Sequence, residues 1–335
     1  LTEHLVLCLN SICGRVNKSG ERVPNPGLLQ PSRPRRAEVL EAQPAFHHGP
    51  KARVRNLGQI IGEMPTATLN DEILLDGEGQ IKALICLGGN PIVAFPDQDK
   101  TKKAMEKLDL LVCVDLYKSA TAKLADYIIA PTLSLERDDI TMLTDTWYDQ
   151  PYSHYTRAIL PKNEQSREEW EIYWELSKRS GIPLELPGGQ LSVEHRPSKF
   201  EVLEMLTPGS KVPLKEIADQ GKGAIFEAVQ VTVEPGRQDQ GALLQLMPAG
   251  ISEQLADVAT ETYWQSGKIT DAGTEYTHLL ISRRLKHVFN SSGQQLEPLQ
   301  KKGTTNPAYM NPEDLGSLGI QSGDLVEVQA AAGSL

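Results

Sequence analysis

Short apolar runs separated by amphipathic segments dominate the pattern between residues 81 and 130. The runs at 81–87, 110–114 and 127–130 are continuous and apolar, which predicts three buried strands. Between them, residues 100–108 predict a helix with a charged outer face, and residues 120–124 predict a shorter helix. This alternation of strands and helices is typical of parallel strands joined by right-handed crossovers. The pattern therefore indicates an α/β domain built on a parallel sheet.

Further helices and strands are predicted outside this region. Residues 2–13 are apolar on almost every side, which is typical of a helix buried inside a larger body. Residues 168–179 are amphipathic and end at Gly181. We expect the inner face of that helix to carry its apolar residues, Trp170, Tyr173, Trp174 and Leu176. Strand patterns at 278–281 and 324–328, with a short helix at 311–318, predict a smaller and incomplete β domain.

These elements divide the chain into five expected parts. We expect a helix and turn from an upstream α/β domain at 1–30, an extended linker at 31–72, an α/β domain at 73–188, a connector at 189–272 and the beginning of a β-barrel at 273–335. The chain begins with Leu1, and its last strand pattern lies close to its end. We therefore expect it to be a fragment of a longer protein.

Charge and cysteine content exclude several kinds of partner. The net charge is −10, from 34 basic and 44 acidic residues, whereas a nucleic-acid-binding face needs to be basic. No apolar run approaches the roughly 20 residues that a membrane-spanning helix needs. The four cysteines, at positions 8, 13, 86 and 113, form no closely spaced pair. We expect them to be free thiols, with no metal ligand set and no iron–sulfur cluster in this chain.

Polar residues follow each predicted strand of the sheet, where ligands bind in open parallel sheets. They are Gly88-Gly89-Asn90, then Asp115, then Glu136 and Arg137. The glycines allow a ligand to approach the backbone, and a carboxylate such as Asp115 accepts two N–H bonds from a planar edge like that of guanine. Asn and Asp also commonly cap turns and helices, so spacing alone leaves both interpretations open.

A second polar group follows the strand pattern at 278–281. It contains Ser282, Arg283, Arg284, Lys286, His287, Asn290 and Ser291. Arginines and hydroxyls at this density suit a phosphate or the edge of a pterin, while ordinary surface charge is the alternative. No nucleophile, catalytic triad or phosphate-binding glycine loop is visible, so no catalytic residue is assigned.

These stretches, in this order, resemble the molybdopterin-dependent oxidoreductases of the dimethyl sulfoxide reductase superfamily. The most specific part runs from Ile85 to Asp139 and ends in an Ala130-Pro131 pair where the family usually has Leu-Pro. A second part covers 280–291, where Ser282-Arg283-Arg284 replaces the usual Thr-Gly-Arg at the entry to the family's double-psi β-barrel. A third part covers 306–328 and is similar to a short helix and strand of that barrel.

The resemblance implies a bis-(molybdopterin guanine dinucleotide) cofactor that carries molybdenum or tungsten. Asn90, Asp115 and Arg137 match positions that hold a guanosine end of the cofactor. The residues that fall where the barrel contacts the pterin and phosphates are Ser282, Arg284, His287 and Asn290. The metal ligand and the usual 4Fe-4S cluster belong to upstream domains, so the chain alone is expected to be inactive.

The resemblance also implies partners and a compartment. We expect the remainder of a catalytic subunit and an iron–sulfur electron-transfer subunit as partners, with no nucleic acid and no membrane insertion. A cytoplasmic location is expected, or a periplasmic one if a twin-arginine signal lies upstream. Two alternatives are a structural relative that lost the cofactor and a free-standing nucleotide-binding module. The residues do not name a substrate.

Overall fold

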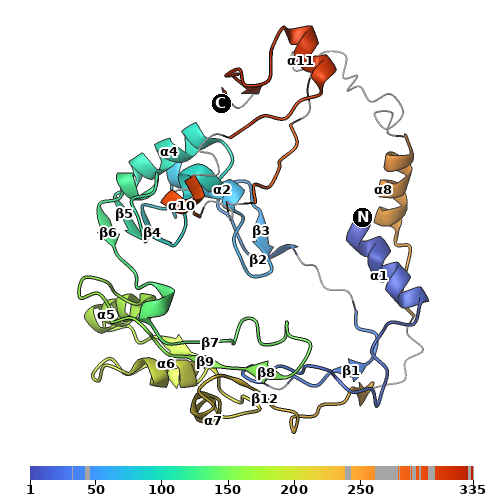
Figure 1. Ribbon diagram of the computed structural model, residues 1–335, viewed down its shortest axis with the longest axis vertical. Helices are drawn as coiled ribbons and strands as arrows, with labels where there is room; N and C mark the ends of the chain where they lie inside the picture. The colour runs from blue at the N-terminus through green and yellow to red at the C-terminus, as the bar shows by residue number, and fades with distance from the viewer. Residues whose placement is uncertain are drawn as a thin grey trace. The chain divides into compact units, whose positions relative to one another are not determined.

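A computed structural model describes most of the chain and divides it into two compact units. The described residues are 1–31, 33–41, 46–237, 243–260, 278, 280–286, 288, 292–293, 296–300, 306–330 and 333–334. The first unit comprises Leu1–Pro44, Val114–Tyr117 and Tyr127–Asp257, and the second comprises Ala45–Cys113, Lys118–Asp126 and Val258–Leu335. Figure 1 shows the elements of both units along the chain.

The predicted α/β pattern is present as a three-stranded sheet in the order β4-β5-β6. The strands are β4 (Ala83–Leu87), β5 (Leu110–Val114) and β6 (Tyr127–Ile129). The Leu110 N–H donates to Lys82 O at the start of both strands, and the Asp115 N–H donates to Ile129 O at the far ends of the next pair. Backbone bonds that join start to start and end to end make the sheet parallel, as predicted.

Helices share a buried core with this sheet. They are α2 (Thr66–Leu74), α3 (Pro91–Ala94) and α4 (Gln98–Lys107), followed by the short 3₁₀ turn η1 (Ala122–Leu124). Ile73, Met105 and Leu111 belong to one buried core with Cys86 and Cys113. Burial of these apolar side chains holds the strands in place, and with them the loops that follow the strands.

Helix α2 and a hairpin occupy much of the segment that was expected to be an extended linker. The hairpin pairs β2 (Phe46–Lys51) with β3 (Gly58–Ile60) in antiparallel fashion. Glu72 of α2 accepts a hydrogen bond from the Val54 N–H at 2.7 Å and an ion pair from Arg53 at 3.3 Å. Asp71 of α2 pairs with Arg55 and with Lys100 of α4. These buried carboxylates link the turn of the hairpin to α2 and α4. Apolar periodicity does not predict such contacts, because the buried residues are charged.

The first unit contains α1 (Thr2–Ile12) and a group of short elements around a separate core. Its strands are β1 (Arg36–Ala37), β7 (Asp139–Ile140), β8 (Tyr152–Ser153), β9 (Tyr155–Thr156), β10 (Glu185–Leu186), β11 (Gly189–Gln190), β12 (Ala224–Ile225) and β13 (Glu234–Pro235). Its helices also include η2 (Ser134–Glu136), α5 (Glu169–Ser180), α6 (Lys199–Leu206) and α7 (Leu214–Asp219). Helix α8 (Ala249–Thr260) follows. Leu28, Leu29, Leu214 and Ile217 are the most buried members of this core.

Helix α5 begins and ends close to the predicted residues, and both α5 and α6 have well-defined ends. Ser198 and Glu201 form a reciprocal capping box at the start of α6, and Gly181 ends α5 with a φ of +70°. The prediction for the inner face of α5 was partly wrong. Trp174 is buried, but Tyr173 and Leu176 are 38% and 45% exposed. The buried stripe instead continues through Glu171 and Ser177, because Lys162 and Arg196 neutralise Glu171.

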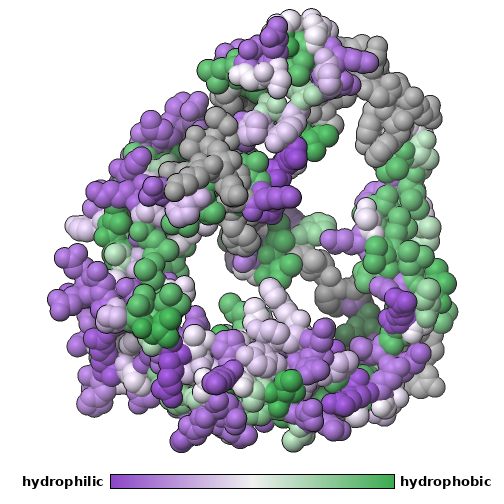
Figure 2. Space-filling model, in the orientation of Figure 1, coloured by the Kyte–Doolittle hydropathy of each residue, from purple (hydrophilic) through white to green (hydrophobic). Residues whose placement is uncertain are grey.

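Helix α1 has the predicted extent and keeps its apolar side chains on the surface. Leu7, Leu9 and Ile12 are 63–71% exposed, and Figure 2 shows the apolar surface that they form. The helix contacts the following chain through His4, whose ring nitrogen bonds to Leu246 O at 2.8 Å. None of the helices in the described ranges combines the length and the apolar character needed to cross a membrane.

Among the described residues of the C-terminal part, the strands do not lie where the sequence predicts them. It has α10 (Glu297–Gln300), α11 (Pro312–Leu318) and a hairpin of β14 (Gln329–Ala330) with β15 (Gly333–Ser334). The predicted strand at 324–328 is wrong, because those residues pair with no other described segment and Leu325 is fully exposed. Residues 278, 280 and 281 are likewise not in a strand, and residue 279 lies outside the described residues. The double-psi barrel stays a prediction.

Candidate functional site

The loop after β4 carries the first predicted site residues and belongs to the second unit. Gly88 has a φ of +61°, a conformation that favours glycine, and a side chain there would meet open space. Asn90 is half-buried and stands at the start of α3, yet it makes no capping bond to that helix. Capping of α3 therefore does not explain Asn90.

Thr121 holds the side chain of Asn90. The Thr121 N–H donates to Asn90 Oδ1 at 3.2 Å, and the Thr121 hydroxyl lies 2.9 Å from the same oxygen. The Ile92 N–H in turn donates to the Thr121 hydroxyl at 3.2 Å. Thr121 lies within the stretch from Ile85 to Asp139 that resembles the family, but the sequence alone assigned it no role. The structure shows that it is fully buried. This loop therefore presents an asparagine whose oxygen is occupied and whose Nδ2 has no acceptor among the described residues.

Asp115 lies at the carboxyl end of β5, in the first unit, beside the end of β6. Its carboxylate is half-buried and accepts one long hydrogen bond, from the Tyr117 N–H at 3.4 Å. Its main-chain N–H donates to Ile129 O at 3.2 Å, which places it at the end of the sheet. Because this carboxylate accepts so few hydrogen bonds from the described residues, it is able to accept N–H donors from a ligand.

The loop after β6 carries Glu136 and Arg137. Glu136 accepts from the Leu133 N–H at 2.9 Å, which closes the η2 turn. Arg137 lies 3.4 Å from both carboxylate oxygens of Glu169 and 3.8 Å from Asp139. Arg137 is thus engaged within its own loop, and a ligand anion there would compete with Glu169.

Thr132 adds an unsatisfied polar atom in the same loop. It is 2% exposed, and its hydroxyl has no hydrogen-bond partner in the part of the chain that the structure describes. Its carbonyl accepts a bond from Arg137 at 3.4 Å. Sequence reasoning missed Thr132, because a lone threonine after a Pro carries no motif.

The second predicted group shows less organisation. Ser282, Arg283 and Arg284 are exposed and lie in an irregular segment. Arg283 stacks on the Tyr309 ring, with the guanidinium carbon 3.9 Å from the ring centroid. His287 and Asn290, the other predicted contacts, lie outside the described residues.

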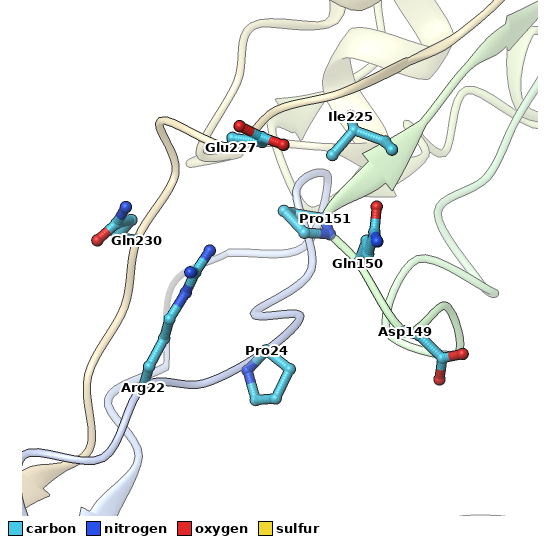
Figure 3. A pocket seen from close by; sticks show the side chains of 8 residues that line it. All are labelled: Arg22, Pro24, Asp149, Gln150, Pro151, Ile225, Glu227 and Gln230. Carbon is cyan, nitrogen blue, oxygen red and sulfur yellow. The ribbon is translucent and has the colours of Figure 1, made fainter.

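A surface cavity of about 450 Å³ lies in the first unit and contains none of the predicted site residues. Its walls are Arg22, Pro24, Asp149, Gln150, Pro151, Ile225, Glu227 and Gln230 (Figure 3). This set contains two carboxylates and a single arginine, so the cavity disfavours a phosphate-bearing ligand.

Each strand-end loop, taken by itself, offers groups that suit part of a guanine nucleotide. Such a ligand brings N–H donors on its base edge and acceptor oxygens on its base, sugar and phosphates. In the first unit Asp115 supplies an available acceptor. In the second unit Asn90 supplies an available donor, and Gly88 leaves open space for a close approach.

Residues 5–179, more than half of the chain, match the model of the family described as molybdopterin oxidoreductase. This chain belongs to the molybdopterin oxidoreductase family. Residues 279–335 match the model described as "Molydopterin dinucleotide binding domain". Together the two matches identify the chain as a cofactor-binding portion of a member of the dimethyl sulfoxide reductase superfamily.

Individual relatives cover the chain broadly at low identity. Trimethylamine-N-oxide reductase of Haemophilus influenzae is 24% identical over 279 residues, covering 76% of this chain and 33% of that protein. F420-dependent formate dehydrogenase subunit alpha of Methanocaldococcus jannaschii is 25% identical over 299 residues, covering 81% of this chain and 38% of that protein. The chain therefore spans about a third of the length of these relatives.

A solved structure supports the fold. Acetylene hydratase from Pelobacter acetylenicus superimposes with a TM-score of 0.54 at 19% identity, over 81% of this chain and 36% of that one. At this identity the likeness concerns the fold alone, and it agrees with the α/β class predicted from the sequence.

Proposed function

We propose that this chain binds and orients the guanosine ends of a bis-(molybdopterin guanine dinucleotide) cofactor in a molybdenum or tungsten oxidoreductase. The observation that carries the proposal is the carboxylate of Asp115. It stands at the carboxyl end of a parallel strand and is half-buried, and among the described residues it accepts a single long hydrogen bond. In a chain of this family, such a group is suited to accept the N–H edge of guanine.

Each strand-end loop has a distinct part in this proposal. Gly88 and Gly89 allow close approach of the ligand, Asn90 donates to it, and Asp115 accepts from it. Arg137 exchanges Glu169 for an anionic part of the cofactor, because the existing contacts of 3.4 Å are long for an ion pair. Ser282, Arg283, Arg284, His287 and Asn290 are proposed to contact the pterin and phosphates from the C-terminal segment that matches the dinucleotide binding model.

The bound metal centre supplies the redox chemistry, and this chain supplies binding and orientation. No residue here is proposed to be catalytic. The activity as a whole depends on the remainder of a catalytic subunit, including the metal ligand and any 4Fe-4S cluster. The relatives named as alpha subunits, which include the formate dehydrogenase, support a multi-subunit enzyme. We propose that its partner is an iron–sulfur electron-transfer subunit. We propose a cytoplasmic location.

The test is replacement of Asp115 by asparagine in the full-length protein, produced with its cofactor. The asparagine keeps the size of the side chain but places an amide hydrogen toward the donor edge of guanine. Leaving buried polar groups of the ligand unmatched costs about 1–3 kcal/mol, which corresponds to roughly 5–150-fold weaker retention. Retention is measured as guanine nucleotide released by denaturation after extensive desalting.

Asp109→Asn is the matched control. Asp109 lies just before β5, its side chain is 72% exposed, and its ion-pair contact is a 4.0 Å approach to Lys82. The control should retain guanine nucleotide as the natural protein does. Equal retention in the Asp115→Asn protein would remove the basis of the proposal.

A further inference from the structure

The orientation of the Asn90 amide is determined by the groups that contact it. The oxygen and nitrogen of an asparagine amide are difficult to distinguish by shape, so hydrogen bonds have to assign them. Here the contacting group is the main-chain N–H of Thr121, 3.2 Å away, and a backbone N–H is only a donor. The atom that faces Thr121 must therefore be the oxygen.

The Thr121 hydroxyl reinforces this assignment. It accepts the Ile92 N–H at 3.2 Å, so its own hydrogen is available for Asn90 Oδ1, 2.9 Å away. Thr121 is fully buried, with no exposed surface, which leaves the hydroxyl little freedom to rotate toward water. Two donors thus hold the Asn90 oxygen, and its NH₂ group is directed elsewhere.

The free side of Asn90 is consequently a donor and not an acceptor. Asn90 is half-buried, and its Nδ2 has no acceptor among the residues that the structure describes. The side chain also makes no bond to the first turn of α3, which excludes the usual role of an asparagine at a helix start. An amide fixed by one end and unpaired at the other is pre-organised for a ligand.

We propose that Thr121 is a positioning residue that locks Asn90 as a donor, so that the ligand atom opposite Asn90 is an acceptor oxygen of the nucleotide. This inference rests on the proposed function, and it adds that Asn90 offers the ligand a hydrogen-bond donor and not an acceptor. Asn90 does not rotate to suit a ligand donor, because rotation would leave the buried donors of Thr121 facing an NH₂ group. The loop after β4 therefore selects for ligand oxygen.

Three variants of the full-length, cofactor-loaded protein test the proposal. Asn90→Asp keeps an oxygen for Thr121 and replaces the outward donor by an acceptor. Thr121→Val keeps the volume of the side chain and removes the hydroxyl, and Thr121→Ser restores the hydroxyl. The measurements are the guanine nucleotide retained after desalting, the rate of its loss, and the thermal midpoint of each protein.

Asn90→Asp is expected to lose nucleotide about 10–100-fold faster while its thermal midpoint before loading stays close to that of the natural protein. Thr121→Val is expected to lose nucleotide about 3–10-fold faster, and Thr121→Ser to recover most of this loss. Natural retention in Asn90→Asp would overturn the proposal, as would a Thr121→Ser protein as poor as Thr121→Val. If Thr121→Val does not fold, Asn90→Asp decides alone.

The Asp115→Asn protein separates this inference from the proposed function. Loss of guanine nucleotide in Asp115→Asn with normal retention in Asn90→Asp would refute only the role of Asn90 and Thr121. Normal retention in both would refute the proposed function as well.

Discussion

Replacement of Asp145 by alanine is expected to destabilise the first unit by about 2–4 kcal/mol. Asp145 is fully buried, and its Oδ2 accepts the Leu28 N–H and, at 2.7 Å, the Leu29 N–H. Leu28 and Leu29 are themselves fully buried core residues. Removing the carboxylate leaves two buried donors without an acceptor, at a cost of about 1–3 kcal/mol each. Relief of a buried charge offsets part of that cost.

The same carboxylate gives a pH dependence with a defined sign. Burial raises the pKa of Asp145 above its ordinary value of 3.8, although the N–H groups of Leu29 and Leu28 oppose the shift. The folded chain therefore binds this proton more readily than the unfolded chain, and the contribution of Asp145 to stability increases as pH falls through the raised pKa. Asp145→Asn cannot take up this proton, so its stability relative to the natural protein should decline as pH falls from 7 toward 4.

Urea unfolding followed by tryptophan fluorescence is the assay, since buried Trp174 reports on the first unit. Asp149→Ala is the control, because Asp149 lies four residues farther along the same loop and is exposed. The control should change stability by less than about 0.5 kcal/mol. The reasoning fails if Asp145→Ala behaves like this control, or if the difference between the natural protein and Asp145→Asn is independent of pH.

Two further substitutions test the packing of the first unit. Burial raises the pKa of Glu171, but its hydrogen bond to Lys162 lowers the pKa, and the net shift is downward. Glu171 therefore stabilises the folded chain at neutral pH, and this stabilisation is lost as pH falls through the lowered pKa. Glu171→Gln should cost about 1–3 kcal/mol at pH 7, and this difference should shrink in acid in chemical denaturation at both pH values. Gly27→Ala should lower the thermal midpoint of the protein more than Gly14→Ala does. Both glycines have a φ near +70°, but only at Gly27 would the added Cβ lie 2.9 Å from the Asp145 carboxylate. Equal losses for the two glycines would contradict the clash.

Apolar periodicity was sufficient to predict the positions of the strands that carry the candidate site. The predicted burial holds for β5 but is wrong for β4 and β6, whose residues are mostly exposed. The runs around Leu111 and Ile128 are continuous, and the polar residues after them follow from the geometry of parallel sheets. The same reasoning missed α2, because its buried side includes Asp71 and Glu72, which are inward only by virtue of their ion pairs. It also misplaced the inner face of α5, where Glu171 takes a buried position.

In the candidate site, too, some residues were predictable from the sequence and others were not. The sequence indicated Asn90 and Asp115 from their place after strands, and the structure explains which atoms of each remain available. It could not indicate Thr121, whose role depends on contact across 31 residues of chain. Arg137 was predicted from the sequence, but its ion-pair partner was not. That partner, Glu169, lies at the start of α5, and no local motif links it to Arg137.

Analysis of the cofactor in the full-length protein tests the central claim most directly. The protein is purified from its natural host, denatured, and assayed for molybdenum, tungsten and released nucleotides. The proposed function predicts a guanine nucleotide together with molybdenum or tungsten, in amounts proportional to the protein. Absence of both, or a nucleotide with a base other than guanine, would contradict the assignment of Asp115 and Asn90 to a guanosine site.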